Sequence, residues 1–224
     1  MKKTREIELD FIVDKLTNSI ENVVTGDSFA TEISVVAIND LKTVTKKNKW
    51  QFDWKLEYKQ PEREIYKLTI VNNQNIIQGL ISLEIKEDHV YMHLVESAPF
   101  NKGRTKMYAG IPGNLVAFAC KLLFQRGFEG NISFFSKTQL VQHYTDSLNA
   151  IHIGGRIMII DTYSSIKTHK QILSKMKNKV KYLDVDMIGE QGKTLTKEEQ
   201  SAISAFIKKQ KEKRLKSEKK KSLA

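Results

Sequence analysis

The fold of this chain is limited above all by a glycine-rich turn that leads directly into an amphipathic segment. An apolar stretch lies on each side of this unit. The turn is Gly110-Ile111-Pro112-Gly113, and the apolar stretches are His89–Val95 and Ile132–Phe135. The first turn of a helix has N–H groups without internal acceptors and the positive end of the dipole, so strand, glycine turn and helix together favour an anion. On the turn alone, however, an ordinary βαβ connection is the better explanation.

Apolar residues recur after the turn at i, i+4 and i+7, which predicts a helix of about fifteen residues that packs on a sheet. One row is Leu115, Ala119 and Leu122, and the next is Val116, Cys120 and Leu123. Cys120, the single cysteine, is predicted to be a small buried side chain rather than a nucleophile. One cysteine also excludes an internal disulfide and a cysteine-based metal site.

The net charge of +11 over 224 residues is unevenly distributed. Residues 208–221 hold nine Lys/Arg and two Glu, which is +7 and leaves +4 for the rest of the chain (11 − 7). No apolar run approaches the ~18–20 residues of a membrane span, and acidic residues interrupt the N-terminal segment where a signal-peptide core would lie. We therefore expect a cytoplasmic protein without a membrane partner.

The first sixty residues predict a helix, a short strand and an aromatic segment. Thr4–Val24 has helical spacing, and Ile33–Ile38 is typical of a strand. Trp50, Phe52 and Trp54 then alternate, a pattern that suits stacking on nucleic-acid bases or, the interpretation that we prefer, a buried strand face or anchoring segment.

Three antiparallel strands should follow, at about 64–70, at Ile77–Ile85 and at about 90–96, joined by polar turns. In the third strand, alternation predicts one face with Val90, Met92, Leu94 and Glu96, and the other with Tyr91, His93 and Val95.

After the central helix, we expect a strand at Ile132–Phe135, a helix at about Lys137–Leu148 with Tyr144 on its apolar stripe, and a buried strand at Ile157–Ile160. Leu173, Met176 and Val180 indicate a further helix, and Gly189 and Gly192 flank a predicted hinge. Thr196 with Glu199 fits a helix capping box. We thus predict one domain over 1–185, then a hinge and a basic tail over 186–224, helical or disordered.

This order of elements resembles the GNAT superfamily of acyl-CoA N-acyltransferases over about residues 60–165. The residues that carry the resemblance are Gln78-Gly79-Leu80, Leu94 to Asn101, Gly110 to Lys121, Ser136-Lys137-Thr138, His143-Tyr144 and Gly154 to Asp161. The resemblance implies an α/β (α+β) mixed sheet, splayed between the strands that hold Met92 and Ile132 and flanked by helices.

The resemblance also implies acetyl-CoA as co-substrate, lying in that splay. Its pyrophosphate would bind the amides of the first helical turn, and its pantetheine arm would pair with the third meander strand. The implied cofactor-binding residues are Leu94, Val95, Ser97, Gly110, Ile111, Gly113, Asn114 and Leu115. Met107 and Pro112 depart from the superfamily's loop, and because proline has no N–H, one phosphate donor is missing.

Acyl transfer to an amine needs a base that takes a proton and donors that stabilise the tetrahedral oxyanion, and it benefits from an acid for the leaving thiolate. Glu96 is the candidate base, although a strand-end carboxylate facing water explains it equally well. Tyr144 matches the superfamily's thiolate-protonating tyrosine, whereas its spacing alone favours a core aromatic. His93 is an alternative base, and histidine spacing predicts no metal.

Three functions follow from these observations. The first is an acetyl-CoA-dependent N-acyltransferase acting by direct attack on a primary amine, in a small molecule or peptide. The second is a non-catalytic GNAT-like binding module, and the third is a nucleic-acid-associated acyltransferase that uses the basic residues 208–221. The sequence leaves the acceptor and the oligomeric state open, a homodimer included.

Overall fold

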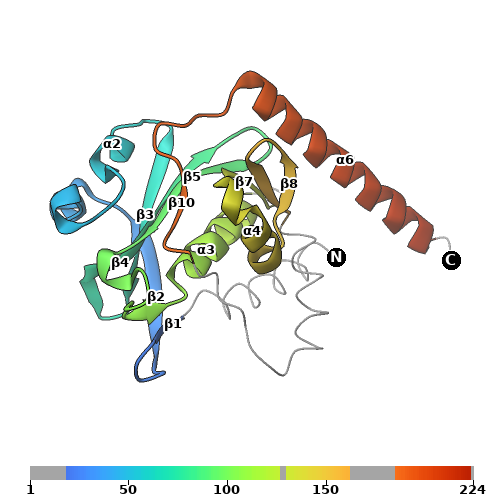
Figure 1. Cartoon of the computed structure of the whole chain (residues 1–224). Helices are drawn as coiled ribbons and strands as arrows, with labels where there is room; N and C mark the ends of the chain where they lie inside the picture. The colour runs from blue at the N-terminus through green and yellow to red at the C-terminus, as the bar shows by residue number, and fades with distance from the viewer. Residues whose placement is uncertain (1–18, 127–129, 162–184, 223–224) are drawn as a thin grey trace.

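The computed structural model describes residues 19–126, 130–161 and 185–222. These residues form one mixed sheet of ten strands with helices on both faces (Figure 1). In spatial order the strands are β6 (Tyr108–Ala109), β1 (Ser19–Asn22), β2 (Ser28–Val35), β3 (Arg63–Ile70), β4 (Asn73–Ile85), β5 (Val90–Ser97), β7 (Asn131–Phe135), β9 (Ile157–Asp161) and β8 (Ile151–Gly154). A tenth strand, β10 (Met187–Gly189), pairs with β5.

The predicted antiparallel meander is confirmed as β3, β4 and β5. Strand β9 lies between β7 and β8, so the prediction that Ile157–Ile160 sits inside the sheet is also confirmed. All five residues of β9 are buried, because a strand with a neighbour on each edge and helices on both faces meets no water.

A β-bulge at His93 interrupts the regular alternation of β5. Leu83 pairs with Met92 and Ser82 with Leu94, so His93 is the extra residue on its strand. Met92 and Val95 consequently belong to one hydrophobic cluster and Leu94 to another. The prediction that Met92, Leu94 and Glu96 share a face is therefore wrong, since the inserted residue reverses the face of every side chain after it.

Helices α3 (Ile111–Gln125) and α4 (Val141–Leu148) cover one face of the sheet (Figure 1). Leu115, Ala119 and Leu123 pack there against β4 and β5 apolar residues, and Cys120 is buried as predicted. Gly79 permits this close approach, because a Cβ at that position would lie 2.5 Å from Ile111 Cγ2.

The opposite face carries α2 (Trp54–Tyr58) and the segment that precedes it. Trp50 and Trp54 are buried there with Leu41 and Leu94, while Phe52 is partly buried. The preferred interpretation of the three aromatics as an anchoring segment is thus confirmed, although Trp54 begins a helix instead of continuing a strand.

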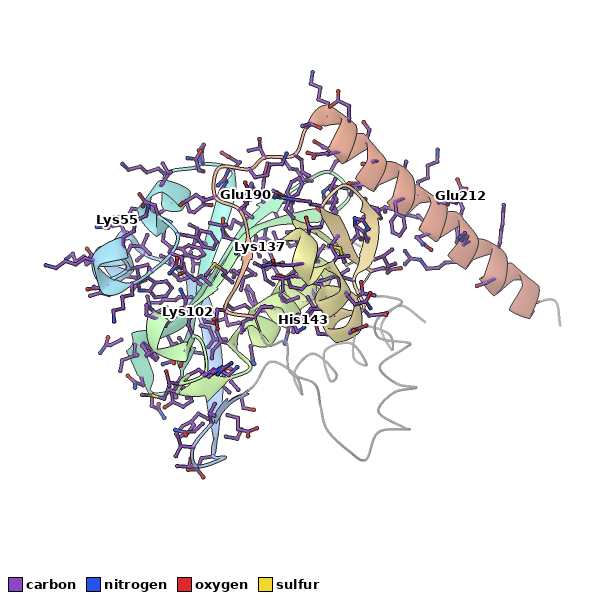
Figure 2. All side chains as sticks on the ribbon, viewed as in Figure 1. Lys55, Lys102, Lys137, His143, Glu190 and Glu212 are labelled. Atoms are coloured by element: carbon purple, nitrogen blue, oxygen red, sulfur yellow. The ribbon has the colours of Figure 1, made fainter. Side chains whose placement is uncertain are left out.

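Helix α6 (Lys197–Ser222) packs its first turns on the same face and then extends beyond the sheet (Figure 1). The predicted capping box is present, since the Glu199 N–H donates to Thr196 Oγ1 at 3.2 Å and the Thr196 N–H donates to Glu199 Oε2 at 2.8 Å. Ile203 and Ile207 are buried against Tyr91 and its neighbours. Glu212 marks the exposed outer part, where polar side chains surround the helix (Figure 2).

Some expectations differ from the structure or lie outside the described residues. Ser19–Asn22 is strand β1, so the helix predicted over Thr4–Val24 is wrong in this part, and residues 4–18 lie outside the described ranges. The helix indicated by Leu173, Met176 and Val180 also lies outside them. The predicted strand Ile33–Ile38 starts earlier, as β2, and the expected hinge contains a strand of the sheet, β10.

Candidate functional site

The sheet opens at the point where β5 and β7 separate. These parallel strands pair at Val90–Ile132, Tyr91–Ser133 and Met92–Phe134, and their pairing ends there while β5 continues to Ser97. The bulge at His93 lies directly after the last pair. The second half of β5 therefore presents a strand edge that β7 does not use.

Strand β10 occupies this edge. It pairs antiparallel with β5 through Met187–Glu96, Ile188–Val95 and Gly189–Leu94, and the Ser97 N–H donates to the Asp186 carbonyl oxygen at 3.0 Å. The backbone of Leu94, Val95 and Ser97, which the family resemblance assigns to a pantetheine arm, thus has a partner from the same chain.

The fit between β10 and the bulge requires glycine at position 189. Gly189 has φ +94°, and a Cβ there would lie 1.9 Å from the carbonyl oxygen of His93. An L-residue would meet both the backbone strain of a positive φ and a collision with rigid backbone. Its neighbour Ile188 points the other way, is 1% exposed and belongs to the core under α3.

Side chains around β10 hold its two ends. The Asp186 carboxylate accepts a hydrogen bond from the Gly103 N–H at 3.1 Å. After the strand, Gln191 exchanges two 2.9 Å hydrogen bonds with the backbone of Asp53. Glu190, labelled in Figure 2, forms an ion pair with Arg156.

The first turn of α3 lies beside the opening. The Asn114 N–H donates to the Gly110 carbonyl oxygen at 3.0 Å, and Pro112 has no N–H, so helix geometry leaves the amides of Ile111 and Gly113 for an external acceptor. The Asn114 side chain donates to the carbonyl oxygens of Ser19 and Gly110, at 3.1 and 2.8 Å, and is structural.

The space in front of this turn is small. A cavity of about 10 Å³ remains there, lined by Gly110, Pro112, Val185 and Asp186 among others. That volume holds about one water molecule. The segment that leads into β10 therefore fills the place where an anion would meet the α3 amides.

Glu96 lies on the α2 face of the sheet as a fully buried carboxylate. It accepts hydrogen bonds from Gln51 N–H at 2.6 Å, Phe52 N–H at 3.3 Å and Trp54 Nε1–H at 2.7 Å. Lys102, labelled in Figure 2, forms an ion pair with the same carboxylate. These contacts anchor the aromatic segment to β5 and occupy both oxygens of the candidate base.

Tyr144 lies on α4 and points into the core under α3. Its ring packs edge-on against Phe134 of β7, with centroids 5.2 Å apart, and it belongs to the same buried cluster as Met92 and Ile188. Burial raises the pKa of the Tyr144 hydroxyl well above its usual range. The phenol therefore stays protonated at neutral pH and is a weaker acid than a solvent-exposed tyrosine.

His93 is buried on the α2 face with Nε2 at 2.8 Å from Glu84 Oε2. Burial holds the pKa of His93 below its ordinary value, although Glu84 opposes this effect. Elsewhere in the described ranges, His, Cys, Asp and Glu side chains form no group of three that would hold a metal ion. Among the same residues, no helix has the length and apolar character to cross a membrane.

The residue pattern indicates neither β10, nor the close approach of Gly189 to His93, nor the four donors around Glu96. Asp186–Gly189 has two apolar side chains, Met187 and Ile188, between an acidic residue and a glycine, which is too short a pattern to indicate a strand. The indole and ammonium partners of Glu96 were visible as residue types, but nothing in their spacing placed them around one carboxylate.

The parallel pair that separates, the bulge, the glycine turn into α3 and the strand order β7-β9-β8 together form a GNAT-like fold, and the predicted fold class is confirmed. Neither a family model nor a curated protein matches the chain. Among solved structures, mutant spermidine/spermine N-acetyltransferase SpeG from Vibrio cholerae is 12% identical, covers 62% of this chain and 98% of its own, and has a TM-score of 0.45.

Two further structures are similar at the same level. The ribosomal-protein-S18-alanine N-acetyltransferase from Escherichia coli is 14% identical over 58% of this chain and 90% of its own, with a TM-score of 0.40. A mutant AtaT toxin, bound to acetyl-CoA and to the C-terminus of the antitoxin AtaR, is 11% identical over 63% of this chain and 99% of its own, with a TM-score of 0.41.

Proposed function

We propose that this chain is an acyl-CoA N-acyltransferase that moves an acetyl group from acetyl-CoA to a primary amine by direct attack. The observation that supports this most is the separation of β5 from β7 beside the first turn of α3. An extended amide-bearing arm would pair with the β5 edge that β7 leaves, in place of β10, and a diphosphate would meet the amides of Ile111 and Gly113.

Tyr144 supplies the proton for the leaving group in this proposal. The amine nitrogen attacks the thioester carbonyl carbon, the C–N bond forms, and the C–S bond breaks. The thiolate takes the proton of the Tyr144 hydroxyl, and the proton released by the nitrogen restores the phenol. Burial raises the pKa of the Tyr144 hydroxyl and so makes it a weaker acid, and the support for this role is its position on α4, with its ring against Phe134 of β7.

In this proposal Glu96 is a positioning residue and does not act as the base. Its two oxygens accept four hydrogen bonds, and an incoming amine would have to displace one of these donors. We assign it to positioning the segment of Gln51, Phe52 and Trp54 beside the end of β5.

A non-catalytic binding module is the second candidate. It is favoured by the pairing of β10 with the second half of β5, which leaves a cavity of only about 10 Å³ at the α3 turn. In that case, the GNAT-like fold would bind partners, with or without acyl-CoA, and no amine would release thiol from acetyl-CoA.

Gly113 permits a test that leaves folding intact. A Cβ at this position meets nothing within 4 Å, and an acidic residue in the first helical turn favours the helix. We expect Gly113→Asp to weaken acetyl-CoA binding at least about tenfold, through charge repulsion, while Gly113→Ala keeps most of the affinity. Isothermal titration with millimolar acetyl-CoA and thiol release over a panel of amines would measure this. Absence of both binding and thiol release would contradict the proposal if it persists in Gly189→Ala protein, in which a Cβ would collide with the His93 carbonyl oxygen and prevent β10 from pairing with β5.

A further inference from the structure

We infer that β10 is an exchangeable strand that occupies the acyl-CoA site, so that an acyl-CoA binds only when Asp186–Gly189 leaves β5. This inference rests on the proposed function. It concerns the strand edge from Leu94 to Ser97, the one place in the described residues where β10 takes part in the sheet.

The chemistry of this edge defines its alternative occupant. Strand β10 satisfies the β5 backbone with peptide groups in an extended chain, and its upstream residues Val185 and Asp186 lie at the α3 turn. A ligand that replaces both parts needs amide groups along an extended arm and an anionic end for the amides of Ile111 and Gly113. An acyl-CoA has both, in its pantetheine amides and its diphosphate.

The two occupants exclude each other sterically. The carbonyl oxygen of Asp186 already accepts the Ser97 N–H, and Ile188 is buried in the core that includes Tyr144. A second extended chain on the same edge would need the same backbone groups and the same space. An acyl-CoA therefore has to displace β10 and cannot bind to β5 beside it.

The attachment of β10 is suited to release. Three residues pair along one edge, whereas the following helix α6 has its own contacts through Ile203 and Ile207 and does not need to move. Gly189 and Gly192, both with positive φ, lie at the end of β10 and in the connection to α6. Displacement of the strand thus breaks its pairing with β5, exposes Ile188 and releases the contacts of Asp186 and Gln191, but it leaves the rest of the sheet and α6 in place.

Gly189 and Gly192 form a matched pair for the test. Both have left-handed backbones, φ +94° and +79°, so alanine is strained at each. A Cβ at Gly189 would collide with the His93 carbonyl oxygen, but a Cβ at Gly192 meets nothing within 4 Å. Only Gly189→Ala should therefore release β10.

The expected effect is a tighter apparent affinity. When the competent state is a fraction of the population, the apparent Kd rises by the inverse of that fraction, so a strand released in about 1% of molecules weakens binding about 100-fold. We expect Gly189→Ala to lower the Kd for acetyl-CoA by about 10- to 100-fold and Gly192→Ala to change it less than about twofold.

A reversible lock keeps the test valid if Gly189→Ala destabilises the protein. Val95 and Ile188 are directly paired, at a spacing that cross-strand disulfides bridge, so Val95→Cys with Ile188→Cys in a Cys120→Ala chain should fix β10 when oxidised. Oxidised protein should bind no acetyl-CoA in isothermal titration at millimolar ligand, and reduction should restore binding in the same sample.

The outcomes separate the inference from the function on which it rests. Tight binding by wild-type and by oxidised locked protein would overturn the inference and leave the function standing. Equal affinities of Gly189→Ala and Gly192→Ala would also overturn it. If hydrogen exchange shows β10 released in Gly189→Ala and acetyl-CoA still does not bind, the proposed function fails and the inference with it.

Discussion

The two halves of β5 have partners of different kinds. Along Val90–Met92 the partner is β7, a strand of five buried residues that is itself bonded to β9 on its other edge. Along Leu94–Glu96 the partner is β10, a strand of three residues that pairs with β5 alone among the described strands. A strand bonded on both edges cannot leave without breaking the sheet, whereas a strand bonded on one edge can exchange for another ligand.

Truncation of a buried side chain should destabilise the protein more in β7 than in β10, and this is the largest effect that we expect. Phe134→Ala in β7 removes a fully buried ring from the shared core and should lower the free energy of unfolding by about 3–5 kcal/mol. Ile188→Ala in β10 should lower it by no more than about 2.7 kcal/mol, the free energy of opening when β10 is released in about 1% of molecules, because β10 opens locally before the protein unfolds. Urea denaturation measures both, and similar losses for the two variants would contradict an exchangeable β10.

The role of Glu96 gives the next largest effect. Glu96→Gln leaves Lys102 without its buried partner and puts an amide among four donors, so we expect a loss of about 2–4 kcal/mol in the free energy of unfolding. Lys102→Met should recover part of this loss in the double variant. A Glu96→Gln protein of wild-type stability that releases thiol hundreds of times more slowly would instead indicate a general base.

The basic outer part of α6 should contribute little to the stability of the sheet or to acetyl-CoA binding. Removal of residues 208–224 keeps the anchoring residues Ile203 and Ile207, so stability and acetyl-CoA affinity should change little. If this part binds nucleic acid, the deletion should weaken RNA binding and flatten its dependence on salt. Filter binding over a range of NaCl concentrations tests this, and an unchanged slope would exclude these residues as the contact.

The smallest effect concerns the bulge that separates the two halves. Burial holds the pKa of His93 below its unfolded value, with Glu84 opposing, so the unfolded state binds more protons once the pH falls below about 6.5. Stability should therefore fall with acidification from that point. His93→Gln should reduce this slope by up to about 1.4 kcal/mol per pH unit, measured by denaturation between pH 7 and 5. An unchanged slope would show that His93 does not contribute.

Periodicity in the sequence was sufficient for the central part of the fold. The meander, α3 and β9 follow from alternation, helical spacing and continuous apolar residues, because each is long enough for its pattern to be distinctive. The N-terminal strand β1 was mistaken for helix, since Ile20 and Val23 fit a helical period while the partners of β1 are distant in sequence.

The candidate site was only partly predictable, for two physical reasons. A bulge is a change of register between two strands, so nothing in the sequence around His93 marks the reversal that places Glu96 beside Trp54. Strand β10 depends on a complementary edge elsewhere in the chain, which the local sequence does not show. In the sequence alone Gly189 indicates a hinge, whereas in the structure it allows the close approach of β10 to His93.

Hydrogen exchange of wild-type protein, followed as acetyl-CoA is added, measures whether β10 and acetyl-CoA compete for the same edge of β5. The backbone amides of β10 and β7 are compared in the same sample, since both strands pair with β5. We predict that β10 amides lose protection in proportion to bound acetyl-CoA while β7 amides remain protected. Saturation with acetyl-CoA that leaves the β10 amides fully protected would contradict the claim that the two compete for one edge.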